Sequence, residues 1–232
     1  MDWLQPVDLY CERTSAAFWA EPVNTLTNIA FVLAALWGAR TARARSDRDP
    51  LVWALIVLAA AVGVGSFLFH TIAERWAELA DTLPIWAFVA LFIYVAIARM
   101  SGRKPHALTA VALAAMVAAV AWSAAQEGAA PGVVAPPGPL NGSGQYAPAV
   151  IALAVFAAVS WRRHHPMRVW IAAATATFCL SLVFRTIDPA ICSSFPLGTH
   201  FLWHLCNALM IGLLLQVILR GPRHTATPAR IC

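Results

Sequence analysis

The stretch LVWALIVLAAAVGVGSFLFH, residues 51–70, contains no charged residue and ends in a histidine. Its length matches the roughly 20 apolar residues that a helix needs to cross a bilayer. Ser66 and His70 lie four positions apart in this run, so they share one face of a helix. Because ionisable groups are costly in lipid and usually mark function, the run predicts both a membrane helix and a site on it.

The composition of the whole chain supports the same interpretation. Of its 232 residues, 60% are hydrophobic and only 12% are charged, whereas a soluble domain carries about a quarter charged residues. We therefore expect an all-α membrane protein whose seven transmembrane helices form one compact bundle. This architecture divides the chain into an extracytoplasmic segment at 1–23, a seven-helix domain at 24–219 and a cytoplasmic tail at 220–232. The predicted spans are 24–42, 51–71, 82–99, 107–125, 146–161, 167–185 and 200–219.

The distribution of charge predicts the orientation of the bundle. The net charge of +5 could suggest a nucleic-acid partner, but the basic residues lie in short loops between apolar runs. All but three of the 16 lysine and arginine residues fall on one side, the exceptions being Arg13, Arg75 and Arg185. By the positive-inside rule the N-terminus is outside and the C-terminus is cytoplasmic. We expect a multi-pass protein of a bacterial inner membrane, with its site near the periplasmic face and a flexible outer loop at 126–146.

The seven histidines fall into two groups in this topology. His70 in G-S-F-L-F-H and His200 and His204 in T-H-F-L-W-H all lie at the outer ends of the second and seventh spans. Three histidines at one membrane level fit a catalytic zinc site, in which protein nitrogens hold the metal and a fourth position stays open for water. The alternative is that they are core histidines that hydrogen-bond across helices. The other four lie among arginines on the inner side: His106, His164, His165 and His224.

Two further polar residues belong to the same end of the bundle. Asp81, in A-D-T-L-P at 80–84, is expected to begin the third span as its N-cap, with Pro84 in the first turn. A carboxylate there could also accept a proton from water beside zinc and pass it to a leaving amine. Ser66 lies one turn from His70 and could either bond a carbonyl of its own helix or donate to a developing oxyanion.

The outer segments hold three carboxylates and two cysteines. Asp8, Glu12 and Glu21 precede the first span, and hard oxygen ligands in one short segment can hold calcium. Ordinary exposed charge is the alternative for these three residues. Cys11 and Cys192 both fall on the predicted outer side, where disulfides persist, and we expect them to pair.

Together these motifs resemble the alkaline ceramidases, within a superfamily of seven-helix membrane hydrolases that includes the adiponectin and progestin receptors and the Per1-like proteins. The resemblance implies a seven-helix bundle with zinc held by His70, His200 and His204. It also implies that Asp81 binds the activating water, that Ser66 assists at the oxyanion, and that an N-terminal acidic segment binds calcium. The segments that carry it are C-E-R (11–13), A-E-P-V-N-T-L-T-N (20–28), G-S-F-L-F-H (65–70), A-D-T-L-P (80–84) and T-H-F-L-W-H (199–204). Asp8, Glu12 and Glu21 look like the calcium ligands, although the family's D-W-C-E reads D-L-Y-C-E here.

The predicted function is a zinc-dependent intramembrane amidase that hydrolyses the N-acyl amide bond of ceramide or a related N-acyl lipid. A zinc esterase or phospholipase, or a seven-helix receptor with a structural zinc site, remains open as an alternative. A metal transporter would need ligands along a path through the membrane, and a retinal protein would need a buried lysine, whereas the only lysine, Lys104, lies in a predicted inner loop. Aromatic residues near the site are candidates to line an acyl cavity: Phe67, Phe69, Trp86, Phe201 and Trp203.

Overall fold

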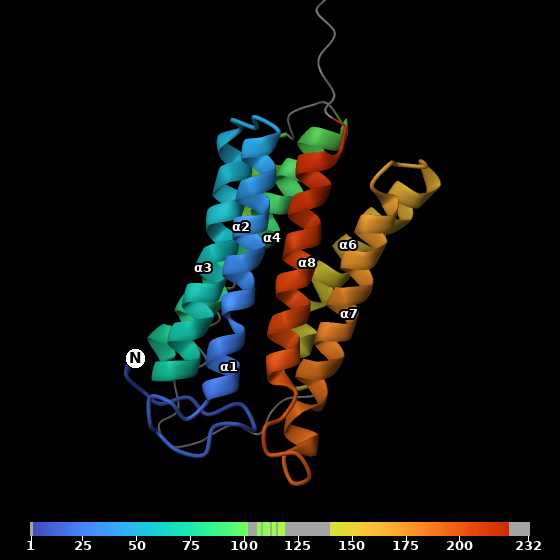
Figure 1. Ribbon diagram of the computed structural model, residues 1–232. Coiled ribbons are helices and arrows are strands. Elements are labelled where there is room, and N and C mark those ends of the chain that lie inside the picture. The colour runs from blue at the N-terminus through green and yellow to red at the C-terminus, as the bar shows by residue number, and fades with distance from the viewer. Residues whose placement is uncertain are drawn as a thin grey trace, which may run out of the picture.

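The computed structural model describes residues 2–101, 106–107, 109–111, 113–114, 116–118 and 140–222. Within these residues the protein is a bundle of helices without a sheet (Figure 1). Six helical segments are long and apolar enough to cross a membrane. They are α1 and α2 taken together (Pro22–Thr27 and Ile29–Ala44), α3 (Pro50–Ile72), α4 (Arg75–Ser101), η1 with α6 (Ser143–Tyr146 and Ala147–Arg162), α7 (Arg168–Ile191) and α8 (His200–Arg220).

The predicted span at 107–125 lies mostly outside the described residues, so the count of seven stays a prediction. The same holds for most of the 126–146 loop, for Lys104 and for nearly all of the 220–232 tail. Of the 126–146 loop, residues 140–146 are described, and they end in the short helix η1. Helical residues are described at 109–111, 113–114 and 116–118.

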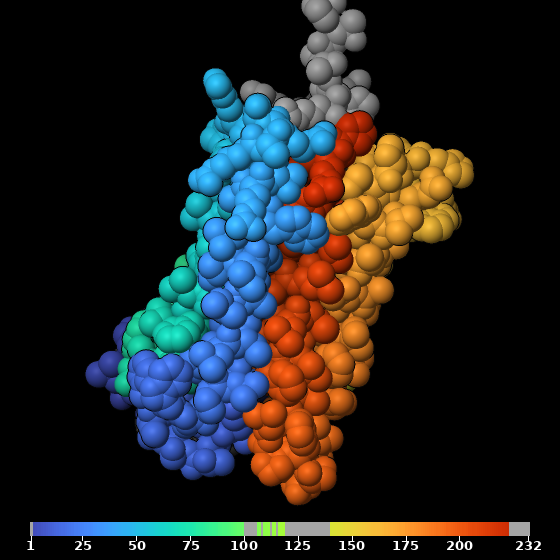
Figure 2. Space-filling model, viewed as in Figure 1, coloured from blue at the N-terminus to red at the C-terminus, as the bar shows by residue number. Residues whose placement is uncertain are grey.

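The helices α2, α3 and α4 alternate in direction, as do α6, α7 and α8, whereas α4 and α6 run the same way (Figure 1). Helix α8 packs between α2 and α7 (Figures 1 and 2). Two glycines, one on α2 and one on α8, allow these helices to pack closely and hold α8 in place. A Cβ on Gly212 would lie 3.1 Å from the Trp37 ring, and a Cβ on Gly38 would lie 2.9 Å from Leu215. Most of α8 is therefore buried, which places the residues of its first two turns inside the protein.

Two predicted helix boundaries are wrong. α4 begins at Arg75 rather than at residue 82, so Asp81 lies in its second turn and is not an N-cap, and Pro84 is inside the helix. α7 continues to Ile191 rather than ending at 185, so Arg185 lies inside the helix, where it is buried, and not at its last position. Both helices extend further toward the end of the bundle where the N-terminal segment lies.

The N-terminal segment is hydrogen-bonded to the turn between α3 and α4. The Val7 amide donates to the Ala73 carbonyl at 2.8 Å, and the Arg75 amide donates to the Gln5 carbonyl at 3.1 Å. Ala73 itself ends α3 in the left-handed conformation, with φ of 49°. In Figure 1 this segment crosses the lower end of the bundle, beneath the end of α3 and the start of α1. It is thereby fixed beside the residues that the sequence predicted to form a site.

Candidate metal centre

Three histidine rings meet inside this end of the bundle. His70 comes from the last turn of α3, and His200 and His204 come from the first two turns of α8. All three side chains are buried, and one ring nitrogen from each lies within 4.8 Å of the others. The Nε2 atoms of His70 and His204 are 3.1 Å apart. The prediction that the three rings converge at one level is confirmed.

The outer nitrogens of two rings are held by hydrogen bonds from the first helix region. The Nδ1 atom of His70 lies 2.6 Å from Glu21 Oε2, and the Nδ1 atom of His204 lies 3.0 Å from Thr27 Oγ1. Because a carboxylate only accepts, His70 carries a proton on Nδ1, and its Nε2 faces the centre. Partners of this kind orient metal-binding histidines and raise their basicity.

Glu21 is in turn fixed by two further side chains. Arg13 pairs with Glu21 Oε1 through its Nε, and the Asn24 side-chain amide donates to Glu21 Oε2 at 3.0 Å. Burial would raise the pKa of the Glu21 carboxyl, but the hydrogen bonds from His70, Asn24 and Arg13 outweigh it and hold the pKa below its usual value. Glu21 is thus an ionised residue that positions His70.

The predicted calcium ligands are arranged differently from a shared ion site. Both oxygens of Glu12 accept backbone amides at the start of α1, from Val23 at 2.7 Å and Asn24 at 2.8 Å. Asp8 is exposed, and both oxygens of Glu21 face protein donors. Among the described residues, the only group of three side chains that could share a metal ion is the histidine trio. This arrangement does not fit a calcium ion.

Ser66 and Asp81 lie side by side next to the histidines, one on α3 and one on α4. Ser66 is completely buried, and its Oγ has no hydrogen-bond partner among the described residues. The alternative in which Ser66 bonds a carbonyl of its own helix is therefore not observed. Asp81 Oδ1 is equally buried and equally without a partner, and Asp81 lies close enough to Ser66 and His70 to interact with both. The site thus keeps a hydroxyl and a carboxylate oxygen side by side, neither of them engaged by a third group of the described residues.

The end of α7 and the loop that follows it set the position of His200. Asp188 accepts the backbone amides of Thr199 at 2.6 Å and His200 at 2.9 Å, which caps the start of α8 from another helix. The predicted disulfide between Cys11 and Cys192 is present, with its Cα atoms 5.2 Å apart. The bond ties the N-terminal segment to the same loop.

Several residues of the site were not predicted from the sequence. The Tyr10 ring stacks on His200 with centroids 3.5 Å apart, and Thr27, Asp188 and the role of Glu21 were also missed. One signal was available for Tyr10, since its neighbour Cys11 was expected to be bonded to the loop before α8. The other contacts depend on the register between helices.

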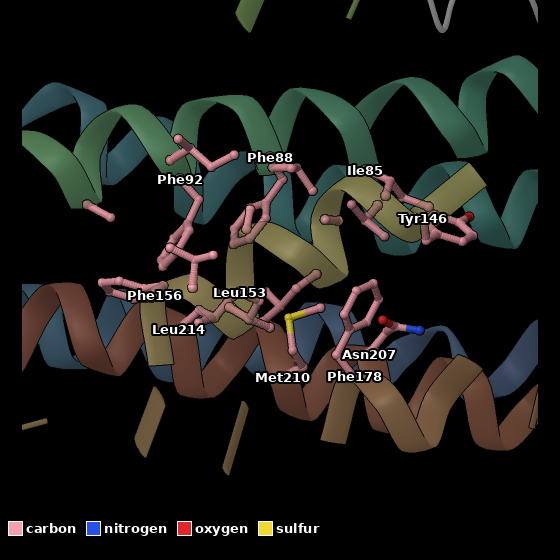
Figure 3. Close-up of a pocket in the computed structure, with 18 of the residues that line it drawn as sticks. Ile85, Phe88, Phe92, Tyr146, Leu153, Phe156, Phe178, Asn207, Met210 and Leu214 are labelled. Carbon is pink, nitrogen blue, oxygen red and sulfur yellow. The ribbon is translucent and has the colours of Figure 1, made fainter. Parts of the chain in front are cut away.

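A largely apolar cavity of about 430 Å³ begins beside the histidines. Figure 3 shows side chains of α4, including Phe88 and Phe92, facing those of α8, including Met210 and Leu214. Trp203 connects the cavity with the histidine cluster, because it lines the cavity and stacks on His200 with ring centroids 5.2 Å apart. It is the only one of the five predicted aromatic residues in the lining.

The cavity runs from Tyr146 and Trp203 toward Ile97 and Arg163 near the opposite end of the bundle. The cavity therefore extends well beyond the aromatic residues near the site that were expected to line it. From Ile85 to Ile97 the helical rise alone amounts to about 18 Å. The remaining lining residues are mostly aliphatic or aromatic, so the space suits a long hydrocarbon chain.

Comparison with known proteins identifies the relationship that the motifs indicated. The sequence model of the ceramidase family matches residues 8–220, which include every helix described above. A comparison with curated proteins gives no significant match. Membership of such a family implies a hydrolase that acts on amide bonds, a lipid substrate and a location in a membrane. The match extends over nearly the whole chain, and we conclude that the chain belongs to the ceramidase family.

Proposed function

We propose that this protein is a zinc-dependent intramembrane amidase that hydrolyses the N-acyl bond of ceramide or a related N-acyl lipid. The observation that carries the proposal is the close approach of the Nε2 atoms of His70 and His204, which lie 3.1 Å apart. Two nitrogens bound to one tetrahedral zinc, each at about 2.0–2.1 Å, lie roughly 3.3 Å from each other. The Nδ1 atom of His200 is buried without a partner, so the third ring also has a nitrogen available. The donor set therefore fits zinc.

When bound, zinc supplies a Lewis acid that polarises the amide carbonyl and lowers the pKa of water at its open position. Asp81 accepts the proton of the attacking water on its free Oδ1 and then gives it to the leaving amine. Ser66 donates its hydroxyl proton to the carbonyl oxygen as negative charge develops there. The Ser66 and Asp81 side chains support these roles, because they lie beside each other and no third group of the described residues engages the Oγ or Oδ1 atom.

The cavity between α4 and α8 receives the acyl chain. Its lining is continuous with Trp203, whose ring also contacts His204 with centroids 5.4 Å apart. A chain lying in it would bring its carbonyl end to the histidines. The products are a free fatty acid and a sphingoid base or similar amine.

The orientation in the membrane follows from charge. Among the described residues, Arg13, Arg75 and Arg185 lie at the end with the histidines, and the other arginines lie at or near the opposite end. The positive-inside rule then gives a seven-helix protein with its N-terminus outside and its C-terminus in the cytoplasm. In a bacterial inner membrane the site would face the periplasm.

The test combines metal analysis with a lipid screen. Purified protein should contain about one zinc per chain, and His200→Ala should lose it, while the exposed His106→Ala should not. The zinc-loaded protein should release fatty acid from N-acyl lipids when a mixture of amide and ester lipids is analysed by mass spectrometry. Full zinc retention by His200→Ala would overturn the ligand set. Cleavage of ester lipids alone would favour an esterase, and zinc binding without any turnover would favour a receptor.

A further inference from the structure

Arg185 is a buried cation in the wall of the proposed active site. It lies on α7, its side chain is only 9% exposed, and arginine keeps its charge at any ordinary pH. A buried charge is costly unless it is paired and hydrogen-bonded. Its partners therefore indicate what the position is built to hold.

Three aromatic rings surround the guanidinium. Its central carbon lies 5.8 Å from the centroid of the Tyr10 ring, 5.8 Å from that of Tyr146 and 5.7 Å from that of Trp203. Such contacts stabilise a cation, more so where water is excluded. They leave its N–H groups free, because a ring face does not replace a hydrogen-bond acceptor in the guanidinium plane.

The hydrogen bonds of Arg185 are incomplete. Nη1 donates to the Tyr10 hydroxyl at 2.8 Å, and Nε is buried without a partner. Within the described residues no carboxylate forms an ion pair with it. Asp81 acts on it electrostatically but shares no hydrogen bond with it. Among the described residues, the guanidinium therefore lacks an anionic partner.

The position of Arg185 indicates that the substrate could supply the missing anionic partner. Tyr10 and Trp203, two of the rings around the guanidinium, both stack on His200. Tyr146 and Trp203 also line the acyl cavity. Arg185 is thus one aromatic ring away from a proposed metal ligand, at the outer end of the cavity, where the amine half of an N-acyl lipid would lie.

We propose that Arg185 binds an anionic group on the amine half of the substrate, so that the preferred substrates are N-acyl lipids with a carboxylate or phosphate close to the amide. This inference rests on the proposed amidase function. The planar fork of an arginine matches both anions through paired N–H donors. Arg185 would then be a residue that determines specificity, beside a reaction carried out by Asp81 and Ser66.

The first test compares lipids that share one acyl chain and differ in the amine half. N-palmitoyl glycine supplies a carboxylate, N-palmitoyl phosphoethanolamine a phosphate, and N-palmitoyl ethanolamine and ceramide are neutral. The wild type should show a kcat/KM about tenfold or more higher for at least one anionic lipid than for the neutral pair. Which anionic lipid is preferred distinguishes carboxylate from phosphate. Equal values for all four lipids would overturn the inference and leave the amidase function standing.

Variants connect the preference to the residue. Arg185→Gln should reduce the anionic-to-neutral ratio about tenfold or more, and Arg185→Lys should restore part of it. Arg75→Gln is the matched control, because this arginine lies at the same end of the bundle and pairs with Glu78. If Arg185 had a purely structural role, its substitution would lower kcat/KM equally for all four lipids. The anionic-to-neutral ratio would then stay unchanged, which would also overturn the inference. Zinc content and Tm identify variants that fail to fold.

A binding measurement keeps the inference separate from catalysis. In an Asp81→Asn background, N-palmitoyl glycine and N-palmitoyl phosphoethanolamine should quench tryptophan fluorescence at lower concentration than N-palmitoyl ethanolamine. Arg185→Lys in the same background should retain more of this difference than Arg185→Gln. If the wild type cleaves no N-acyl lipid, the amidase proposal fails, while the presence or absence of this binding preference still decides whether Arg185 recognises an anion.

Discussion

Gly65 of α3 lies directly against the carbonyl oxygen of Ala80 of α4, so that a Cβ atom at residue 65 would collide with it. Pro84 lacks the N–H that would bond this carbonyl in a regular helix. The contact is also next to Ser66 and Asp81, which follow the two residues in the chain. Gly65 therefore determines how closely the proposed oxyanion donor and the proposed proton acceptor approach each other.

Gly65→Ala should push α3 and α4 apart at this point. We expect a loss of stability of about 1–3 kcal/mol, as is usual for overpacking, and a fall in kcat that exceeds any change in zinc content. Tm, metal analysis and kinetics measure the three effects. Gly144→Ala is a suitable control because a Cβ there would meet no atom within 4 Å. Wild-type activity in Gly65→Ala would show that the spacing of Ser66 and Asp81 is not critical.

Glu21→Gln should weaken zinc binding without removing it. The amide keeps the shape of the side chain but loses the charge that orients His70 and raises its basicity, which typically costs about 10–100-fold in metal affinity. Competition with a chromophoric chelator measures the change. Glu74→Gln should bind zinc as the wild type does, because Glu74 bonds the Trp76 indole instead. Equal affinity in both variants would argue against the role of Glu21.

Ser66→Ala should keep zinc and lower kcat by about 10²–10³-fold, the usual cost of one oxyanion donor. Thr71→Val is the matched control, because it removes a buried hydroxyl at the end of the same helix that bonds the Phe67 carbonyl instead. Rates measured at saturating substrate separate the chemical step from binding. If both variants lost activity equally, Ser66 would have only a structural role.

The histidines could be identified from the sequence because a polar residue is conspicuous in an otherwise apolar run. Residues such as His70 and Ser66 stand out in an uncharged stretch, and the helix period shows which of them share a face. Cys11 and Cys192 were matched in the same way, since the topology placed both on the outer side. What could be predicted was the membrane level of each residue.

The missed features depend on contacts between helices. Pro84 suggested a helix start, whereas it lies inside α4, where the missing hydrogen bond falls beside Gly65. Glu21 appeared to be a ligand for calcium, but the fold turns it toward His70 and pairs it with Arg13. Arg185 was expected at the last position of its span, whereas α7 continues to Ile191 and buries it. None of these partners is close in sequence, so no local pattern could reveal them.

Leu153→Trp should shorten the range of acyl chains that are accepted. Leu153 lies on α6 and projects into the cavity (Figure 3), so a larger side chain there fills space that a long chain would occupy. We expect kcat/KM to fall for long-chain substrates and to change little for short ones. Ile151→Trp, two residues away and 63% exposed, controls for the added bulk on α6. A uniform loss across chain lengths would place the acyl chain elsewhere.

Calcium should not be required for activity. The guanidinium of Arg13 already supplies a cation to Glu21, and its Nη2 donates to the His70 carbonyl at 2.9 Å, while Glu12 is occupied in capping α1. Protein stripped of metal by a chelator should therefore regain full activity with zinc alone, and added calcium should leave both activity and Tm unchanged. Arg13→Gln breaks a buried ion pair, so it should cost about 3–5 kcal/mol of stability, and calcium should not restore it. A need for calcium in addition to zinc would show that the N-terminal carboxylates rearrange to bind an ion after all.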